Sequence, residues 1–314
     1  MILITGGLGY LGARIANYLI HSEKKVLLGI RSGANNIPDT LKDCEVCIVD
    51  LEDQENLNRA CNGVDTVIHL AGMNAKDCSL DPEKAILING IGTLNLLNAA
   101  KLAKVKNFIY FSTVHVYGPT LAGFYSEDSQ TNPVHPYSIS NQIAENYVLS
   151  TSDNSDLNCT IFRLSNAVGS PLNKEVNCWS LVMNDLCKSI ASIGTLELNS
   201  SKKSRRDFIS ISEVCRVILF FLDNKISSKS CEIYNLSSGV SISLEELAYL
   251  VAARAKVFFG RESEIKFNYI EDSTLSLNLD ISNKKLKEMG IELSPSIIDD
   301  VDDLHKCCSQ WFNK

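Results

Sequence analysis

Residues 2–12 read ILITGGLGYLG and decide the fold, because an apolar strand runs straight into glycines at positions 6, 9 and 12. Glycines at this spacing permit a tight turn, let the backbone approach a pyrophosphate, and allow the following helix to pack closely. The free N–H groups at the start of that helix attract phosphate charge. The stretch therefore predicts a strand, loop and helix that bind a dinucleotide, with cofactor contacts at Gly6, Gly9, Tyr10, Leu11 and Gly12.

Apolar, strand-like runs alternate with helix-like patterns through the first half of the chain. Runs that are apolar nearly throughout predict strands buried on both faces of a parallel sheet. The alternation with helices predicts right-handed crossovers between those strands. We therefore expect an α/β fold with a Rossmann-type, doubly wound parallel sheet. Its expected strands are 2–5, 25–30, 44–49, 66–70, 107–112 and 159–164, and its expected helices include 11–20, 86–103 and 137–149.

The strand–helix rhythm loosens after about residue 170. Helix-like patterns are mixed there with short strands, which predicts a smaller C-terminal α/β substrate domain. We expect a dinucleotide-binding domain over residues 1–170 and the substrate domain over 171–314, with some of its segments able to return to the main sheet. The expected helices are 175–193, 213–221, 244–255 and 299–312, and the expected strands lie near Thr195, Phe208, Ile233 and Ile265.

The composition argues against several functional classes. The 314 residues are 45% hydrophobic and 21% charged, with a net charge of −7, as in an ordinary soluble globular protein. Basic residues are concentrated only at 202–206, so a nucleic-acid partner is not expected. The first residues lack the pattern of a signal peptide, and no apolar run reaches about 18 residues. We therefore expect a cytoplasmic protein without a membrane segment.

Eleven cysteines are scattered without a recurring spacing, and the five histidines show no metal-ligand spacing. Cys44 and Cys47 form a C-x-x-C, but residues three apart on a strand point to opposite faces. We therefore expect buried, reduced thiols and no metal site. The adjacent Cys307 and Cys308 are expected to be half core and half surface.

A second informative stretch, residues 136–145, reads PYSISNQIAE. It resembles the PYxxSKxxAE segment of the extended short-chain dehydrogenase/reductases, with Asn141 at the lysine position. Residues 50–51 (DL), 69–72 (HLAG) and 89–93 (NGIGT) resemble further marks of that family, as does the G-x-x-G-x-x-G spacing of the loop. The resemblance spans almost the whole chain and implies an NAD(P)-dependent enzyme.

The resemblance implies a role for each matched residue. Tyr137 takes the place of the catalytic group that protonates a carbonyl oxygen, or deprotonates a hydroxyl, as hydride moves. Residues 111–118, FSTVHVYG, resemble the SSxxVYG stretch of the family. By that match Thr113 would bond the reacting sugar oxygen. His115, two residues later, can point into the substrate site, where we expect a pocket-wall or core role rather than proton transfer. Cofactor contacts are implied at Asp50, Leu51, Leu70, Ala71, Gly72, Asn89, Tyr137 and Asn141.

Asn141 changes the expected chemistry. In the family the lysine at this position holds the nicotinamide ribose and lowers the pKa of the tyrosine. A neutral amide can hydrogen-bond the ribose, but it supplies no charge. Three interpretations stay open: a slower reductase in which Tyr137 enters protonated, a substitute cation or water chain, or a protein that has lost catalysis and kept binding.

The end of the second expected strand, residues 29–33, reads GIRSG and contains no acid. A carboxylate there would bind both ribose hydroxyls and repel a 2′-phosphate. Arg31 can instead make charge-assisted contacts to a phosphate, and Ser32 can add a hydroxyl. We expect NADP(H) as the preferred cofactor, with NAD(H) possible; the alternative is that Arg31 stacks on adenine or faces water.

Three stretches of the second half resemble nucleotide-sugar enzymes of the same family: 163–171 (RLSNAVGSP), 206–209 (RDFI) and 234–239 (YNLSSG). The resemblance implies that Asn166 touches the substrate and that Arg206 binds its nucleoside diphosphate, which suits a planar guanidinium fork. The implied partners are a nucleotide-diphosphate sugar and a second copy of the chain in a homodimer.

The exact reaction is narrowed but not fixed. Sugar 4,6-dehydratases carry an extra acid and base beside the catalytic threonine, and this chain has Val114 and His115 there. Dehydration is therefore disfavoured, and Arg31 favours an NADPH-dependent 4-ketoreductase. Two alternatives remain: a nucleotide-sugar 4-epimerase with retained NAD(P), and a catalytically impaired dinucleotide-binding protein on the same fold.

Overall fold

The computed structural model describes residues 1–33, 36–119, 122–224, 231–260, 262–268 and 278–312. The chain forms two compact units that interleave along the sequence. The first contains Met1–Leu121, Glu127–Leu164 and Cys215–Asn235, and the second contains Ala122–Ser126, Ser165–Val214 and Leu236–Lys314. A functional boundary after residue 170 stays a prediction.

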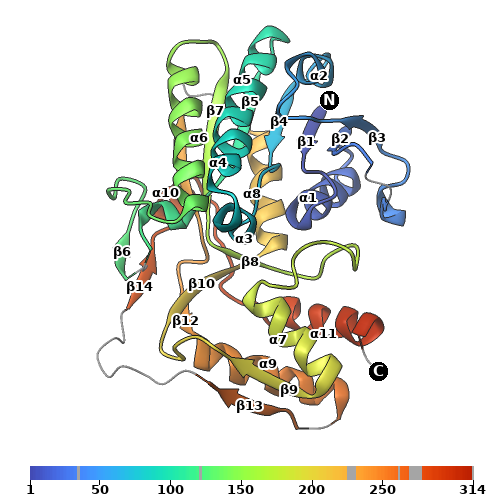
Figure 1. The fold of residues 1–314 in the computed structure, drawn as a ribbon, viewed down its shortest axis with the longest axis vertical. Coiled ribbons are helices and arrows are strands. Elements are labelled where there is room, and N and C mark those ends of the chain that lie inside the picture. Colours follow the sequence, from blue (N-terminus) through green and yellow to red (C-terminus); the bar gives the residue numbers. More distant parts are fainter. Residues whose placement is uncertain (34–35, 120–121, 225–230, 261, 269–277, 313–314) are drawn as a thin grey trace. The chain divides into compact units, whose positions relative to one another are not determined.

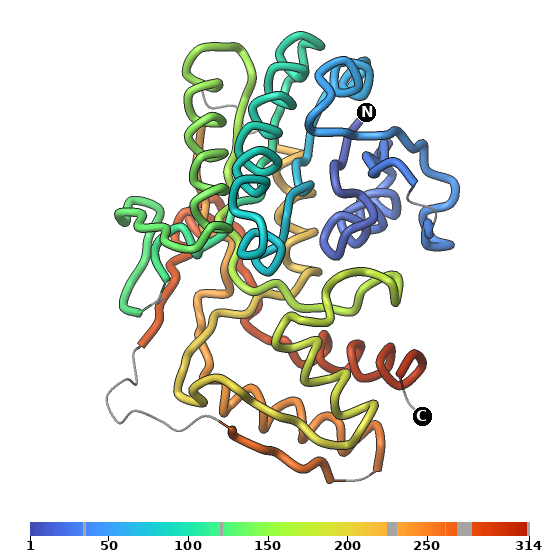
Figure 2. Tube along the Cα trace, viewed as in Figure 1, coloured from blue at the N-terminus to red at the C-terminus, as the bar shows by residue number. Residues whose placement is uncertain are grey.

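The first unit is built on a seven-stranded sheet with the order β11-β7-β5-β4-β1-β2-β3. Figure 1 labels these strands except β11, and Figure 2 shows the path of the chain as a tube. Neighbouring strands from β3 to β7 pair in parallel. From β1 the chain first adds β2 and β3 on one side and then β4, β5 and β7 on the other. The sheet is therefore doubly wound, which confirms the predicted fold class. The strands are β1 (Ile2–Thr5), β2 (Val26–Ile30), β3 (Glu45–Ile48), β4 (Thr66–His69), β5 (Asn107–Thr113), β7 (Asn158–Leu164) and β11 (Glu232–Leu236).

Helices link these strands and cover the sheet. Right-handed crossovers that leave β1 in opposite directions place α1 on one face and α5 and α6 on the other. The helical segments are α1 (Tyr10–His21), η1 (Asp39–Leu41), α2 (Gln54–Ala60), α3 (Ala75–Leu80), α4 (Pro82–Ala85), η2 (Ile86–Ile91), α5 (Gly92–Leu102), η3 (Val114–Tyr117), α6 (Pro136–Asp153) and α8 (Ile211–Asp223), the last of which begins in the second unit.

The predicted helix 86–103 is divided, because η2 has the wider turns of a π-helix before α5 begins. The Thr93 hydroxyl donates a hydrogen bond to the backbone oxygen of Asn89 at 2.5 Å. Such wide turns are frequent at functional sites. Asn89, a predicted cofactor residue, lies within this segment.

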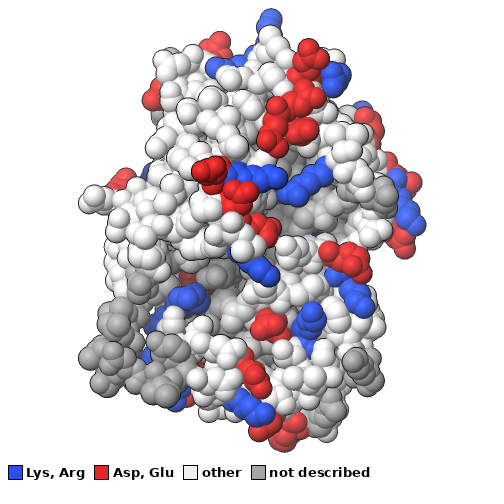
Figure 3. All heavy atoms as spheres, in the orientation of Figure 1, with Lys and Arg blue, Asp and Glu red and all other residues white. Residues whose placement is uncertain are grey.

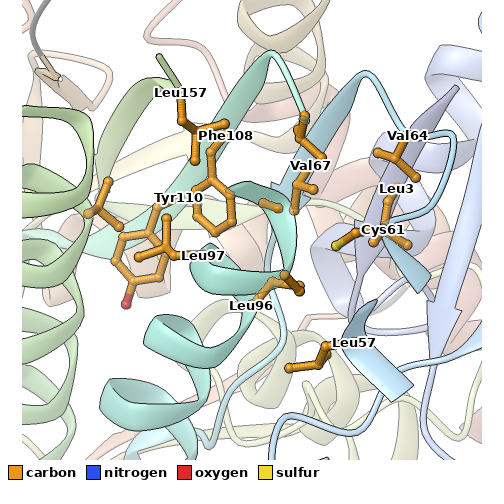
Figure 4. Close-up of a cluster of buried hydrophobic side chains, with 14 of the residues drawn as sticks. Leu3, Leu57, Cys61, Val64, Val67, Leu96, Leu97, Phe108, Tyr110 and Leu157 are labelled. Atoms are coloured by element: carbon orange, nitrogen blue, oxygen red, sulfur yellow. The ribbon is translucent and has the colours of Figure 1, made fainter. Parts of the chain in front are cut away.

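The core under α2, α5 and α6 consists of buried apolar side chains from both the sheet and the helices. Figure 4 shows Val67 and Phe108 of the strands facing Leu96 and Leu97 of α5. These four side chains are fully buried. Burying a side chain of this kind contributes roughly 1.5–3 kcal/mol, so this layer fixes α5 against the strand ends.

One edge of the sheet departs from the expectation of strands buried on both faces. β3 is the terminal strand, and Val46 and Ile48 are 40% and 49% exposed. An edge strand has a neighbouring strand on one side only. The hydrophobic pattern of the sequence does not predict which strand lies at the edge. Cys44 and Cys47 are half-buried rather than buried, so that expectation was wrong for both, whereas Cys308 is buried and Cys307 half-buried as predicted.

One described helical stretch, Pro82–Leu102, is long and apolar enough to cross a membrane, and half of its most apolar window is buried. The core helix of a soluble protein has the same properties. Leu96, Leu97, Ala99 and Ala100 of this stretch belong to the core of the first unit. We therefore interpret it as a core helix.

The second unit contains three small sheets and four helices in its described part. Its sheets have the orders β12-β10-β8, β13-β9 and β14-β6. Their strands are β6 (Gly123–Tyr125), β8 (Asn166–Val168), β9 (Thr195–Leu198), β10 (Arg205–Ser210), β12 (Ser241–Ser243), β13 (Glu264–Phe267) and β14 (Leu279–Ile281). The helices are α7 (Val182–Ile193), α9 (Leu244–Phe259), α10 (Lys284–Glu288) and α11 (Ile298–Phe312).

Helices α7, α9 and α11 share one apolar core in this unit. The predicted strands near Thr195, Phe208 and Ile265 are confirmed as β9, β10 and β13. The predicted helix 175–193 begins only at Val182. The residues before it form turns instead, and Trp179 Nε1 donates a hydrogen bond to the backbone oxygen of Lys174 at 2.8 Å.

Candidate active site

The loop after β1 has the geometry that its glycines predict. Gly6 adopts a φ of 67°, in the left-handed region that favours glycine. A Cβ at Gly12 would lie 2.2 Å from the backbone oxygen of Gly6, so no larger residue fits there. Gly9 precedes α1, which begins at Tyr10 followed by Leu11, and no side chain caps its first N–H groups. The loop therefore offers close backbone approach and the N-terminus of a helix, which fits a dinucleotide pyrophosphate.

A buried hydrogen-bond chain ties this loop to η2. Thr5 Oγ1 accepts hydrogen bonds from the two backbone N–H groups of Leu70 and Ala71 and lies 2.7 Å from His69 Nδ1. Its own hydrogen is therefore donated to Nδ1, which leaves the ring hydrogen on Nε2, 3.0 Å from Thr93 Oγ1. Burial lowers the pKa of His69 to about 3. His69 is thus a neutral structural residue, as a packed strand-end histidine would be.

Two pockets of the first unit contain most of the predicted cofactor residues. The first pocket has a volume of about 200 Å³. It brings together residues that are far apart in the sequence, from the end of β4, from η2, from β5 and from α6. Its lining is His69, Leu70, Ala71, Gly72, Met73, Asn74, Asn89, Tyr110, Phe111, Tyr137 and Asn141.

The second pocket has a volume of about 480 Å³ and shares Ala71, Gly72 and Met73 with the first. It collects four of the predicted cofactor residues: Arg31, Ser32, Asp50 and Leu51. Lys84 of α4 also lines it, together with the acids Glu52 and Asp77. Basic and acidic side chains are likewise interspersed over the face drawn in Figure 3.

Tyr137 lies in the first turn of α6, where His135 accepts a hydrogen bond from its backbone N–H at 3.1 Å. Desolvation of the phenol raises the pKa of Tyr137 to about 12, with the thiol of Cys78 acting in the same direction and a hydrogen bond with Thr113 opposing both. No cation is among the groups that shift this pKa. The phenol is therefore protonated throughout the neutral pH range.

Thr113 and His115 stand at the end of β5 and in η3. Thr113 is buried, and its hydroxyl accepts a hydrogen bond from the backbone N–H of His115 at 3.2 Å. The hydrogen bond with Tyr137 brings two of the three predicted catalytic residues together. His115 is partly exposed and lines neither of the two pockets.

Asn141 is held by two hydrogen bonds. Its Nδ2 donates to the backbone oxygen of Tyr137 at 2.7 Å, and its Oδ1 accepts from the Tyr110 hydroxyl at 2.8 Å. Asn89 is fixed in the same region, because its Nδ2 donates to Ser140 Oγ at 2.9 Å. These contacts set the amide orientations on the wall of the first pocket.

A buried ion pair anchors the rest of α6 to the sheet. Arg163 of β7 contacts Glu145 through two nitrogens, at 3.1 and 2.8 Å. Glu145 also accepts a hydrogen bond from Ser112, the residue before Thr113, at 2.5 Å. The helix that contains Tyr137 is thus fixed to the strand that contains Thr113.

The two predicted substrate residues of the second unit have local roles in β8 and β10. Asn166 Nδ2 donates to the backbone oxygen of Asp207 at 2.8 Å. Arg206 donates to Ser204 Oγ at 3.0 Å and to the backbone oxygen of Arg205 at 3.2 Å. Burial lowers the pKa of Arg206, whose partners among the described residues are neutral. A guanidinium of this kind can still bind an anion.

Several residues of the two pockets were not predicted from the sequence, among them Lys84, Tyr110 and Met73. Lys84 lies five residues before the quoted motif 89–93, and Tyr110 lies one residue before the quoted motif 111–118, so neither belongs to a pattern that carries meaning by itself. Only the pairing of β4 with β5 and the packing of α4 bring them to the pockets.

The sequence model of the NAD dependent epimerase/dehydratase family matches residues 2–237. UDP-glucose 4-epimerase of Mycoplasma genitalium is 26% identical over 82% of this chain and 81% of that protein. Low-salt glycan biosynthesis protein Agl12 of Haloferax volcanii is 27% identical over 86% of each chain.

Solved structures share the fold. RMD from Pseudomonas aeruginosa in complex with NADPH aligns with a TM-score of 0.80, 23% identity and 98% coverage of both chains. MoeE5 in complex with UDP-glucuronic acid and NAD aligns with a TM-score of 0.80, 19% identity and 97% coverage of both chains. With more than half of its length matched by the family model, the chain belongs to the NAD-dependent epimerase/dehydratase family of extended short-chain dehydrogenase/reductases.

Proposed function

We propose that the protein is an NADP(H)-dependent 4-ketoreductase that acts on a nucleotide-linked sugar. The observation that carries this proposal is geometric: Tyr137 lines the first pocket and forms a hydrogen bond with Thr113. Burial raises the pKa of this phenol, and no cation is among the groups that lower it. A group that is protonated near neutral pH can donate a proton to a carbonyl oxygen, but it is rarely available as a base. Reduction of a ketone begins with that donation, whereas epimerisation of an alcohol begins with proton removal.

In the proposed reaction, the cofactor supplies the hydride when bound. Tyr137 donates its phenolic proton to the oxygen of the C4 carbonyl as the carbon receives the hydride, and the resulting phenolate takes a proton back from solvent. Thr113 holds the phenol and offers a hydroxyl to the same oxygen. Asn141 contributes hydrogen bonds rather than charge, so turnover is expected to be slow.

The preference for NADP(H) is supported by the second pocket. Arg31 and Ser32 line it, and Lys84 supplies a second cation. A 2′-phosphate is stabilised by such charge-assisted contacts, and an acid that would repel it is missing from the end of β2. The acids Asp50, Glu52 and Asp77 line the same pocket and leave NAD(H) as the alternative.

Arg206 and Asn166 are proposed to contact the substrate, Arg206 at the diphosphate. We also propose a homodimer formed through the outer faces of η2, α5 and α6, as the family resemblance implies. Leu87 and Leu102 on this side are 50% and 70% exposed. Light scattering of the purified protein tests the dimer, and a monomer at all concentrations would contradict it.

Nucleotide-sugar 4-epimerisation is the second candidate, because UDP-glucose 4-epimerases are among the relatives that align over most of this chain. A catalytically impaired binding protein is the third, because Asn141 supplies no charge. The epimerase would interconvert UDP-glucose and UDP-galactose without net change in cofactor, and the impaired protein would bind dinucleotide and turn over nothing.

The test is NADPH oxidation with a panel of nucleotide-linked 4-keto sugars, for the wild type, Tyr137→Phe and Asn141→Lys. Tyr137→Phe is expected to lower kcat by about 100-fold or more, since the general acid is removed. Tyr147→Phe on the same helix is the matched control and keeps its activity. Turnover that is unchanged in Tyr137→Phe, or absent from the wild type and Asn141→Lys alike, overturns the reductase.

A further inference from the structure

Tyr110 and Asn141 form a buried pair on the wall of the first pocket. They lie 31 residues apart in the sequence, one on β5 and the other on α6, and the Tyr110 hydroxyl lies 2.8 Å from Asn141 Oδ1. Both side chains are nearly inaccessible to solvent, and both line the pocket that also contains Tyr137. Neither the ordinary chemistry of a core tyrosine nor the reaction described above requires this pairing.

The direction of each hydrogen bond follows from the donors available. The Tyr137 backbone oxygen can only accept, so the Asn141 group that lies 2.7 Å from it is the Nδ2 amide. Oδ1 therefore faces Tyr110, whose hydroxyl must donate. Burial, with the negative charge of Glu145 and the neighbouring phenol of Tyr137 acting in the same direction, raises the pKa of Tyr110 well above its ordinary value. Tyr110 is therefore a permanent donor, and it holds the amide in one orientation.

Each amide nitrogen carries two hydrogens, and the contact to Tyr137 uses one of them. We propose that Tyr110 is a positioning residue that orients Asn141, so that the second N–H of its amide binds an oxygen of the dinucleotide. This inference rests on the proposed function. In this arrangement the neutral amide of Asn141 takes the place of the charged lysine of the family. The orientation of that amide depends on the hydroxyl of Tyr110 on β5.

The test compares the affinity for NADP⁺, measured by calorimetry, among variants of the full chain. Tyr110→Phe is expected to weaken binding about 3- to 10-fold, the equivalent of one net hydrogen bond. Asn141→Ala is expected to weaken it by a similar factor. The double variant Tyr110→Phe/Asn141→Ala should bind no more weakly than Asn141→Ala alone, because Tyr110 acts only through Asn141.

Tyr117→Phe is the matched control. The Tyr117 hydroxyl also donates to a buried asparagine, Asn235, at 2.6 Å, but neither residue lines the first pocket. Its removal should lower stability without changing the NADP⁺ affinity. If Tyr110→Phe does not fold, Tyr110→Phe/Asn141→Leu, which replaces both polar partners by apolar groups, is compared with Asn141→Leu alone. Equal NADP⁺ affinity of the two supports the inference, and weaker binding by the double variant overturns it.

Three results would overturn the inference: an affinity of Tyr110→Phe within twofold of the wild type, losses in the two single variants that multiply in the double variant, or an equal loss in Tyr117→Phe. A wild type that binds neither NADP⁺ nor NAD⁺ would overturn the proposed function itself and this inference with it. The two failures are distinguishable, because the former leaves wild-type binding intact.

Discussion

Arg163→Met is expected to lower the free energy of unfolding of the first unit by about 3–5 kcal/mol, because it leaves the buried carboxylate of Glu145 without its cation. The side chain of Glu145 is 0% exposed and that of Arg163 is 5% exposed. The remaining partners of the carboxylate are Ser112 at 2.5 Å and Gln142 at 3.3 Å. Neutral donors of this kind cannot replace a charge–charge contact inside a protein.

The double variant Glu145→Met/Arg163→Met removes both charges and fills the space with apolar atoms. It should recover much of the loss, because replacing a buried ion pair by hydrophobic groups is often close to neutral. The exposed pair of Lys106 and Asp65 is the control. Lys106→Met is expected to cost less than about 1 kcal/mol, since solvent screens the charges of exposed pairs.

Urea unfolding followed by far-ultraviolet circular dichroism measures these differences. Both tryptophans, Trp179 and Trp311, lie in the second unit, so their fluorescence reports on that unit. Arg163→Met should also lower kcat, because the pair fixes the helix of Tyr137 to the strand of Thr113. A loss of stability below about 1 kcal/mol in Arg163→Met, or a double variant no more stable than the single one, would refute this account of the pair.

Three further predictions concern other sites. Between pH 7 and pH 5 the free energy of unfolding should fall by about 2 kcal/mol because of His69. The unfolded residue gains a proton below its ordinary pKa of 6.5, whereas the pKa in the folded protein is about 3. Urea titrations measure this fall, and an equal fall in His69→Gln would contradict the prediction. Gly12→Ala should weaken NADP⁺ binding at least about 10-fold in calorimetry, because the added Cβ would lie 2.2 Å from the backbone oxygen of Gly6. An unchanged affinity would show that this loop does not bind the dinucleotide. Ser243→Ala breaks the capping box of α9 and should lower the free energy of unfolding by about 1 kcal/mol, measured by thermal unfolding. An unchanged unfolding temperature would contradict a stabilising role of the cap.

The sequence by itself determined the nucleotide-binding half of the fold. Each of the six strands expected there matches an observed strand within a residue or two at either end, and β1 matches at both ends. Apolar runs and glycine positions are local properties of the sequence. They favour the same strand or turn whatever the strand order of the folded protein. The glycine loop, the second-strand cation Arg31 and the position of Tyr137 on its helix could be predicted for the same reason.

Only the tertiary structure decided how the pockets are completed. Tyr110 meets Asn141 because β5 packs under α6, and Lys84 joins Arg31 because α4 lies at the wall of the second pocket. The pKa of Tyr137 is likewise a property of its surroundings, raised by burial. Contacts between residues far apart in sequence depend on strand order, helix packing and desolvation, which no local pattern encodes. The sequence motif therefore predicts which groups react, and the packing around those residues sets their pKa and orientation.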